Sequence, residues 1–208
     1  SVSVTSGGIS QTVTTDGNGT FTATSVPAGN ATVQVTTPSG FTVSTNNSPQ
    51  TVAVTDGGTF ASQPIGLARF ATVNGSVWRD LDSDRVRDSG EPGLAGWRVE
   101  LLNAASGAVV LAATTDAGGQ YTIASVVPAT TYRVRYTSPS GAVFGVGVNG
   151  ETGNAQAGSV VNPATRSLEI TPPPGVTLTQ QSLPVDPQGL FFDTLSRQPL
   201  AGVQVTFN

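Results

Sequence analysis

The sequence contains no cysteine, histidine, methionine or lysine, and all nine of its basic residues are arginine. The lack of cysteine excludes disulfides and thiolate chemistry, and the lack of both cysteine and histidine excludes the usual zinc sites. Without histidine, the chain also lacks the side chain most often used for general acid–base catalysis. Because there is no cysteine, the sequence does not indicate a redox compartment.

Charge is also scarce, since only 11% of the residues are charged and the net charge is -4. No basic patch occurs, so nucleic acid and anionic membranes are poor partners. No apolar run approaches the roughly 20 residues of a membrane span, which argues against membrane insertion. There is neither a signal peptide nor an initiating methionine, so we expect the chain to be a piece of a longer protein.

What the chain does contain favours strands and turns. Threonine, serine, valine, glycine and proline replace the missing charge, and short alternating apolar stretches are separated by turn residues every 8–12 positions. Examples are residues 9–15 and 20–24, joined by the Asp-Gly-Asn-Gly turn at residues 16–19. A second hairpin is expected within residues 160–170. These patterns predict an all-β fold built from β-sandwich modules.

An acidic loop spans residues 80–91 and holds five of the thirteen acidic residues. The acids occupy loop positions one, three, five, nine and twelve, which is the spacing of a twelve-residue calcium loop. Such a loop also supplies a backbone carbonyl at position seven. The predicted calcium ligands are Asp80, Asp82, Asp84, Val86, Asp88 and Glu91.

One loop position departs from the calcium signature. Position six normally holds glycine because the backbone turns sharply there, and here it is Arg85. A left-handed backbone at an arginine is strained by roughly 1–3 kcal/mol. An alternative is a solvated acidic loop that is balanced by Arg79, Arg85 and Arg87. Surface pairs of this kind contribute about 0–1 kcal/mol and need no regular spacing, so the spacing favours bound calcium with a structural role.

An internal repeat sets the expected domain organisation. Residues 14–21 align with residues 114–121, and Leu-Ala-Gly at 200–202 matches Leu-Ala-Gly at 94–96. We therefore expect one complete module and one module that is split between the two termini. The expected parts are the C-terminal part of a module at 1–67, a complete module with the acidic loop and an extended C-terminal segment at 68–187, and the opening strands of a following module at 188–208.

Residues 75–141 resemble the SdrD B-like module of the wider Cna B-type and carboxypeptidase-regulatory-like group. The resemblance is carried by Val-Trp-Arg-Asp at 77–80, the acidic loop, Pro-Gly-Leu-Ala-Gly at 92–96, Thr-Thr-Asp at 114–116 and Gln-Tyr at 120–121. It implies a prealbumin-like or immunoglobulin-like β-sandwich in a large, secreted bacterial surface protein, with calcium in the acidic loop. Some Cna B-type modules close a lysine–asparagine crosslink, which this lysine-free chain cannot form.

These observations favour a structural repeat of an extracellular, cell-surface adhesin or fibre. Its partners are expected to be neighbouring modules of the same protein, or identical subunits joined head to tail by strand addition. An alternative is an adhesin module that recognises a host protein, a surface protein or a glycan through its loops. Trp78 and Trp97 do not mark such a face, because their alternating strand positions predict that both lie in the core.

An enzyme is the third class considered. Residues 145–150 fit Gly-x-Gly-x-x-Gly, but no helix is expected after them, so a dinucleotide site is disfavoured. The acidic residues outside the loop are scattered singly rather than paired as in a glycosidase. We therefore expect no catalytic activity.

Overall fold

The computed structural model describes residues 1–82, 84–144, 148–149, 159–162 and 167–185. The chain divides into two compact units, unit 1 (Ser1–Phe70) and unit 2 (Ala71–Asn208). Every regular element among the described residues is a strand, and no helix there is long and apolar enough to cross a membrane. The prediction of an all-β fold is therefore confirmed.

Unit 1 contains a four-stranded antiparallel sheet in the order β2-β1-β3-β5 and a two-stranded sheet, β4-β6. Alternation along β1 and β3 buries Val2, Val4, Ala31 and Val33 on one face of the larger sheet. The strands of unit 1 are β1 (Val2–Ser6), β2 (Ile9–Val13), β3 (Gly29–Val35), β4 (Phe41–Val43), β5 (Gln50–Val54) and β6 (Leu67–Arg69).

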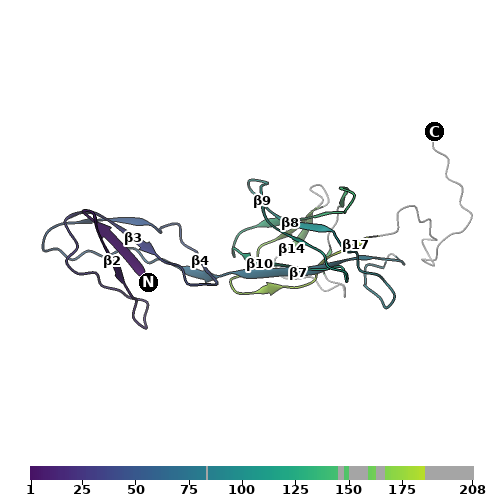
Figure 1. Cartoon of the computed structure of the whole chain (residues 1–208), viewed down its shortest axis with the longest axis horizontal. Coiled ribbons are helices and arrows are strands. Elements are labelled where there is room, and N and C mark those ends of the chain that lie inside the picture. Colours follow the sequence, from purple (N-terminus) through teal and green to yellow (C-terminus); the bar gives the residue numbers. More distant parts are fainter. Residues whose placement is uncertain (83, 145–147, 150–158, 163–166, 186–208) are drawn as a thin grey trace, which may run out of the picture. The chain divides into compact units, whose positions relative to one another are not determined.

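Unit 2 is a two-layered sandwich (Figure 1). One layer has the order β14-β15-β11-β8-β9, and β12 also pairs with β11. The other layer has the order β10-β7-β17-β13, and β16 also pairs with β7. The strands of unit 2 are β7 (Ala71–Arg79), β8 (Arg98–Asn103), β9 (Val109–Thr114), β10 (Gln120–Val126), β11 (Tyr132–Thr137), β12 (Val143–Phe144), β13 (Val148–Asn149), β14 (Ser159–Asn162), β15 (Ser167–Ile170), β16 (Thr177–Leu178) and β17 (Gln181–Val185).

The core of unit 2 lies between these layers. Burying each large apolar side chain stabilises the fold by about 1.5–3 kcal/mol. Tyr121 and Tyr136 also donate their hydroxyl hydrogens to the Gln181 carbonyl, which fastens β17 to the core. Burial raises the pKa of both tyrosines, so their hydroxyl groups stay protonated as donors. The fully buried apolar side chains with the largest volumes are Trp78, Tyr132, Tyr136, Leu101, Leu168, Ile170, Val73, Val77, Val99, Val126 and Val134.

The internal repeat is visible in three dimensions. Strands β1, β2, β3 and β5 of unit 1 follow the same order and antiparallel pairing as β8, β9, β11 and β15 of unit 2. The two repeated turns also share their hydrogen bonds. Oδ1 of Asp16 accepts from the Asn18 and Thr20 amides at 2.9 Å, and Oδ1 of Asp116 accepts from the Gly118 and Gln120 amides at 2.9 and 2.8 Å.

One expected strand is absent from unit 1. The sequence predicts a strand over residues 20–24, but this segment belongs to none of the strands of unit 1, all of which is described. Its counterpart in unit 2 is β10, which pairs with β7. Unit 1 has no counterpart of β7, so residues 20–24 have no neighbouring backbone with which to form a ladder.

The hairpin predicted over residues 160–170 is confirmed, because β14 and β15 pair antiparallel with Asn162 opposite Ser167. Residues 163–166 lie outside the described part of the chain. Most of the glycine motif at 145–150 also lies outside it, and its two described residues, Val148–Asn149, form strand β13.

Candidate metal centre

The acidic loop begins where strand β7 ends, and its first residue is held from two sides. The Asp80 amide donates to the Val185 carbonyl of β17 at 3.1 Å, so the start of the loop is fixed to a neighbouring strand. The Asp80 side chain is buried, and its Oδ2 accepts the Arg85 amide at 2.8 Å. A buried carboxylate is costly unless opposite charge or hydrogen bonds compensate it.

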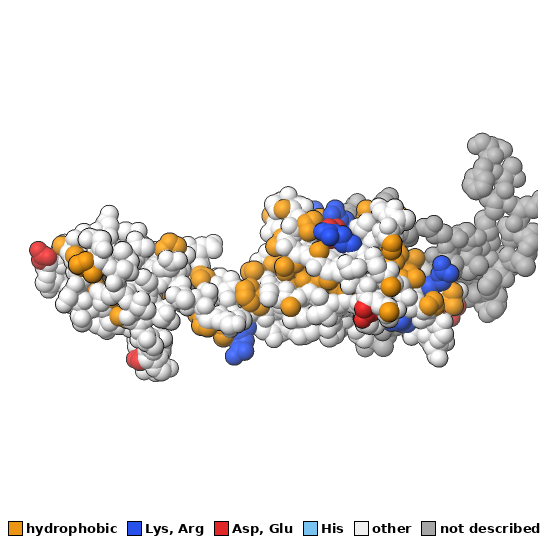
Figure 2. Space-filling model, viewed as in Figure 1, with side chains coloured by type: hydrophobic (Ala, Val, Ile, Leu, Met, Phe, Trp, Pro, Cys, Tyr) orange, Lys and Arg blue, Asp and Glu red, His pale blue; other side chains and the backbone are white. Residues whose placement is uncertain are grey.

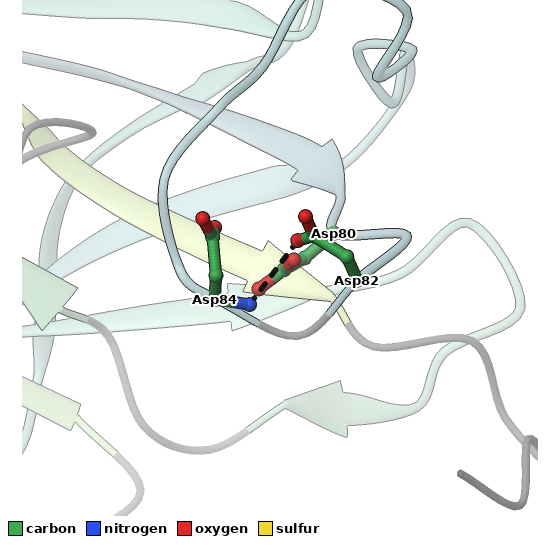
Figure 3. Close-up of side chains that lie close together, drawn as sticks. All are labelled: Asp80, Asp82 and Asp84. Atoms are coloured by element: carbon green, nitrogen blue, oxygen red, sulfur yellow. Dashed lines mark hydrogen bonds between the residues drawn. The ribbon is translucent and has the colours of Figure 1, made fainter. Parts of the chain in front are cut away.

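Three carboxylates gather at this point. Asp80, Asp82 and Asp84 each offer one oxygen, and these oxygens all lie within 4.8 Å of one another (Figure 3). Their spacing follows from two local turns, in which Asp82 Oδ1 accepts the Asp84 amide at 3.3 Å and Asp84 Oδ1 accepts the Val86 amide at 2.7 Å. Asp82 and Asp84 are exposed, so a cation can reach the cluster from solvent.

Glu91, at loop position twelve, closes the loop. Its Oε1 accepts the Leu81 amide at 2.5 Å and its Oε2 accepts the Asp88 amide at 3.0 Å, and only 9% of Glu91 is exposed. The Glu91 amide in turn donates to the Asp88 carbonyl at 3.2 Å. Glu91 thus fastens both ends of the loop together through its carboxylate.

Three of the six predicted ligands, Asp80, Asp82 and Asp84, therefore lie together in the carboxylate cluster. Val86 and Asp88 lie in the same loop, where their amides donate to the carboxylates of Asp84 and Glu91. Ligation of calcium by any of the six residues stays a prediction.

Arg85 occupies the left-handed region that loop position six requires, with φ of 66°. The sharp turn of a calcium loop is thus present, although the residue is not glycine. The Asp80 carboxylate supports this turn by accepting the Arg85 amide.

A second arginine links the loop to the repeated turn at residues 116–119. Arg87 donates from Nη2 to the Gly118 carbonyl at 3.0 Å. The sequence did not reveal this contact, because the two residues are 31 positions apart and belong to two different local motifs. Nearby, a Cβ at Gly93 would lie 1.9 Å from the Gly118 carbonyl oxygen, so glycine allows these two loops to approach closely.

The chemistry of the cluster fits a hard divalent cation. Its donors are carboxylate oxygens, and the chain offers neither histidine nor cysteine to attract softer metals. Because Asp80 is buried beside two further carboxylates, a cation would relieve their mutual repulsion. Aspartates 80, 82 and 84 are therefore the residues that would hold such an ion.

Both tryptophans lie in the interior, as predicted. Trp78 is fully buried at the end of β7, and Trp97 is 6% exposed just before β8. Neither side chain forms an aromatic surface beside the acidic loop.

Comparison with known proteins points to one family. The family model of the SdrD B-like domain matches residues 71–184, which is more than half of the chain. Serine-aspartate repeat-containing protein D of Staphylococcus aureus (strain Newman) is 31% identical over 155 residues, and the match covers 65% of this chain. Serine-aspartate repeat-containing protein F of Staphylococcus epidermidis (strain ATCC 12228 / FDA PCI 1200) is 29% identical over 141 residues, covering 62% of this chain.

The matches span only 11% of the first relative and 8% of the second. Among solved structures, the Bacillus anthracis TIE protein matches with a TM-score of 0.37 and 17% identity, covering 89% of this chain and 30% of that chain. Family membership therefore rests on the family model and the sequence relatives.

Proposed function

The chain belongs to the SdrD B-like domain family, and on this basis we propose that it is a structural repeat segment of an extracellular, cell-surface adhesin or fibre. Unit 2 is the complete module, and unit 1 belongs to a module whose remaining strands come from elsewhere. Bound calcium stiffens unit 2, and strand addition joins modules head to tail. No catalytic role is proposed.

The observation that carries the calcium proposal is the cluster of buried Asp80 with Asp82 and Asp84. A cation held there would tie the loop to the end of β7, which is itself bonded to β17 through Asp80 and to residue 92 through the Arg79 amide at 2.9 Å. A ligand that binds only the folded state raises its stability by mass action. Extracellular calcium sites have dissociation constants of around 10⁻⁴–10⁻³ M, so such a site would fill outside the cell.

Thermal unfolding with calcium and with excess chelator tests this proposal. At a calcium concentration about ten times the dissociation constant, we expect a stabilisation of about 1.4 kcal/mol and a rise in Tm of about 2–6 °C. Asp82→Asn should remove most of this rise. Asp56→Asn, which changes an exposed aspartate of unit 1, is the matched control and should retain it.

Two results would contradict the calcium proposal. One is an unchanged Tm for the wild-type protein when calcium is added. The other is an equal rise in Asp82→Asn and the wild-type protein, which would place the ion away from the acidic loop.

A further inference from the structure

Three arginines lie on the outer face of the sheet layer that contains β8 and β11 in unit 2. Arg98 belongs to β8, and Arg133 and Arg135 belong to β11. Their neighbours Val99 and Val134 are fully buried, so alternation along each strand turns the arginines away from the core. Figure 2 shows basic side chains gathered around an acidic one on the surface of unit 2. Strand pairing thus brings together basic residues that are far apart in the sequence.

The register of the two strands sets these arginines in a row. Arg135 follows Arg133 by two residues along β11, and Arg98 lies opposite Thr137, which is two residues further on. Two residues of a strand span about 6.4–6.8 Å, and neighbouring strands lie about 4.7–4.9 Å apart. The three side chains therefore leave the sheet at successive two-residue steps, and the last of them is displaced by one strand. We call these three residues the arginine row.

Two glutamates hold the arginine row in place. Glu100 accepts hydrogen bonds from Arg98 Nε at 2.7 Å and from Arg135 Nε at 2.8 Å, and Glu169 accepts one from Arg133 Nε at 3.2 Å. The Glu100 side chain is only 7% exposed. The arginine side chains of the row are 57%, 33% and 36% exposed, in sequence order. The arginines thus cover the negative charge of Glu100 and present positive charge to solvent.

The arginine row keeps hydrogen-bond donors that the glutamates do not use. Arg98 and Arg133 each donate through Nε, and within the described part of the chain their Nη groups have no acceptor. Each guanidinium group has five N–H donors, and pairs of these donors match the two oxygens of a carboxylate. Because the glutamates already restrict these side chains, binding a further acceptor costs less conformational entropy. Carboxylates are therefore suitable ligands for the row.

We propose that the arginine row binds an extended acidic peptide whose carboxylates occupy alternate positions. Side chains at alternate positions of an extended peptide point to the same side and repeat every 6.4–6.8 Å or so, which is the step between the arginines. Carboxylates at adjacent positions would instead point to opposite sides. This inference goes beyond the proposed structural role, and it depends neither on calcium nor on how modules are joined.

The exposure of the row sets the strength and the salt dependence of this binding. An exposed ion pair strengthens binding by a factor of up to about five, so three pairs give weak binding. The Glu169 side chain is 27% exposed and repels part of an acidic ligand. Salt screens exposed charges, so we expect binding at an ionic strength of about 0.01 M and its loss at about 1 M.

The test is an NMR titration of the isotope-labelled full chain with two synthetic peptides of identical composition and blocked ends. One alternates Asp and Thr, and the other repeats Asp-Asp-Thr-Thr; threonine favours the extended conformation in both. The buffer is free of calcium and of chelator, so the peptide cannot bind through a metal ion. We expect the alternating peptide to bind about threefold or more tightly and to shift the amide signals of β8 and β11.

Substitutions in the row locate the binding. Arg98→Gln and Arg133→Gln should each weaken binding of the alternating peptide by about threefold or more, because each removes one ion pair. Both variants leave Arg135 paired with Glu100, which protects the fold. Arg79→Gln removes the same charge from an exposed position on β7, in the other layer, and should change the affinity by less than about twofold.

Four outcomes would overturn the proposal. The first is no binding of either peptide at low salt. The second is equal affinity for the two peptides, since the spacing of the carboxylates would then have no effect. The third is an equal loss of affinity in Arg79→Gln and Arg133→Gln, which would indicate attraction by net charge alone. The fourth is tighter binding of a sulfated polysaccharide than of the alternating peptide, which would assign the row to a different class of ligand.

Discussion

Arg85 illustrates how a single residue can meet the requirement of a loop at a cost. The loop needs a left-handed turn at this position, and Arg85 adopts it with φ of 66°. The hydrogen bond from its amide to Asp80 helps to hold that conformation. The cost is steric strain, because the Cβ atom of a left-handed residue crowds its own backbone. Glycine has no Cβ atom and avoids this strain.

We therefore predict that Arg85→Gly stabilises the protein and strengthens calcium binding. Glycine relieves the backbone strain of the folded state, but its greater freedom in the unfolded chain offsets part of this gain. The net effect should raise the free energy of unfolding by about 0.5–1 kcal/mol. Removing a positive charge near the carboxylates should strengthen binding by about threefold or more. Thermal unfolding in chelator measures the first effect, and calorimetric titration with calcium measures the second.

Arg85→Gln separates these two causes, because it removes the charge but keeps the Cβ atom. It should strengthen calcium binding without stabilising the protein in chelator. If Arg85→Gly were less stable than the wild-type protein in chelator, the strain argument would be wrong.

Adjacent strands β8 and β11 are joined on one face by an ion-pair cluster. Glu100 lies directly opposite Arg135, and its two oxygens are 2.7 Å from Arg98 Nε and 2.7 Å from Arg135 Nη2. Burial of Glu100 raises the pKa of its carboxyl group, but hydrogen bonds from the two arginines outweigh this effect, so its pKa is lowered from 4.5.

This shift predicts a pH-dependent contribution to stability. Since the folded pKa of Glu100 lies below its unfolded value, the stabilisation is complete above pH 4.5 and is lost as the pH falls through the folded pKa. At pH 7, Glu100→Gln should cost about 1–2 kcal/mol, because the arginines are partly exposed and solvent screens the pairs.

Urea unfolding of the wild-type protein and Glu100→Gln from pH 7 to pH 3 measures this contribution. The two stabilities should converge below pH 4.5. Glu169→Gln on β15 is the control, since Glu169 lies 3.2 Å from Arg133 and is more exposed, so its loss should be smaller. A Glu100→Gln deficit that stays constant with pH would exclude the proposed origin.

At the scale of the whole molecule, the chain divides into two units, and the acidic loop belongs entirely to unit 2. A ligand protects the cooperative unit to which its site belongs. We therefore predict that calcium slows hydrogen exchange in the strands of unit 2, above all near β7 and β17, and leaves unit 1 unchanged.

Native-state hydrogen exchange with and without calcium measures this effect, at a protein concentration where the chain is monomeric. Asp82→Asn should lose the protection of unit 2. Equal slowing of exchange in the β1–β3 sheet would show that the units unfold together, which would contradict their treatment as independent modules.

The sequence by itself determined the features that depend on neighbouring residues. In β1, β3 and β11, the alternation of residue types in the sequence matches the alternation of more and less buried side chains. Turn residues predicted the loop at Asp16 and its repeat at Asp116. The spacing of the acids brought Asp80, Asp82 and Asp84 together, because alternate residues in successive tight turns place their side chains on the same side.

Only the tertiary structure decided the features that depend on distant partners. Residues 20–26 and β10 share a pattern, yet only β10 is a strand, because only unit 2 supplies β7 beside it. Two further features depend on the tertiary structure in the same way. The Glu91 carboxylate accepts hydrogen bonds from two backbone amides of the loop, and Arg87 donates to the Gly118 carbonyl of another loop. The backbone N–H and C=O groups of a strand form their hydrogen bonds with another segment of the chain. Local sequence can therefore favour a strand conformation but cannot supply the neighbouring strand.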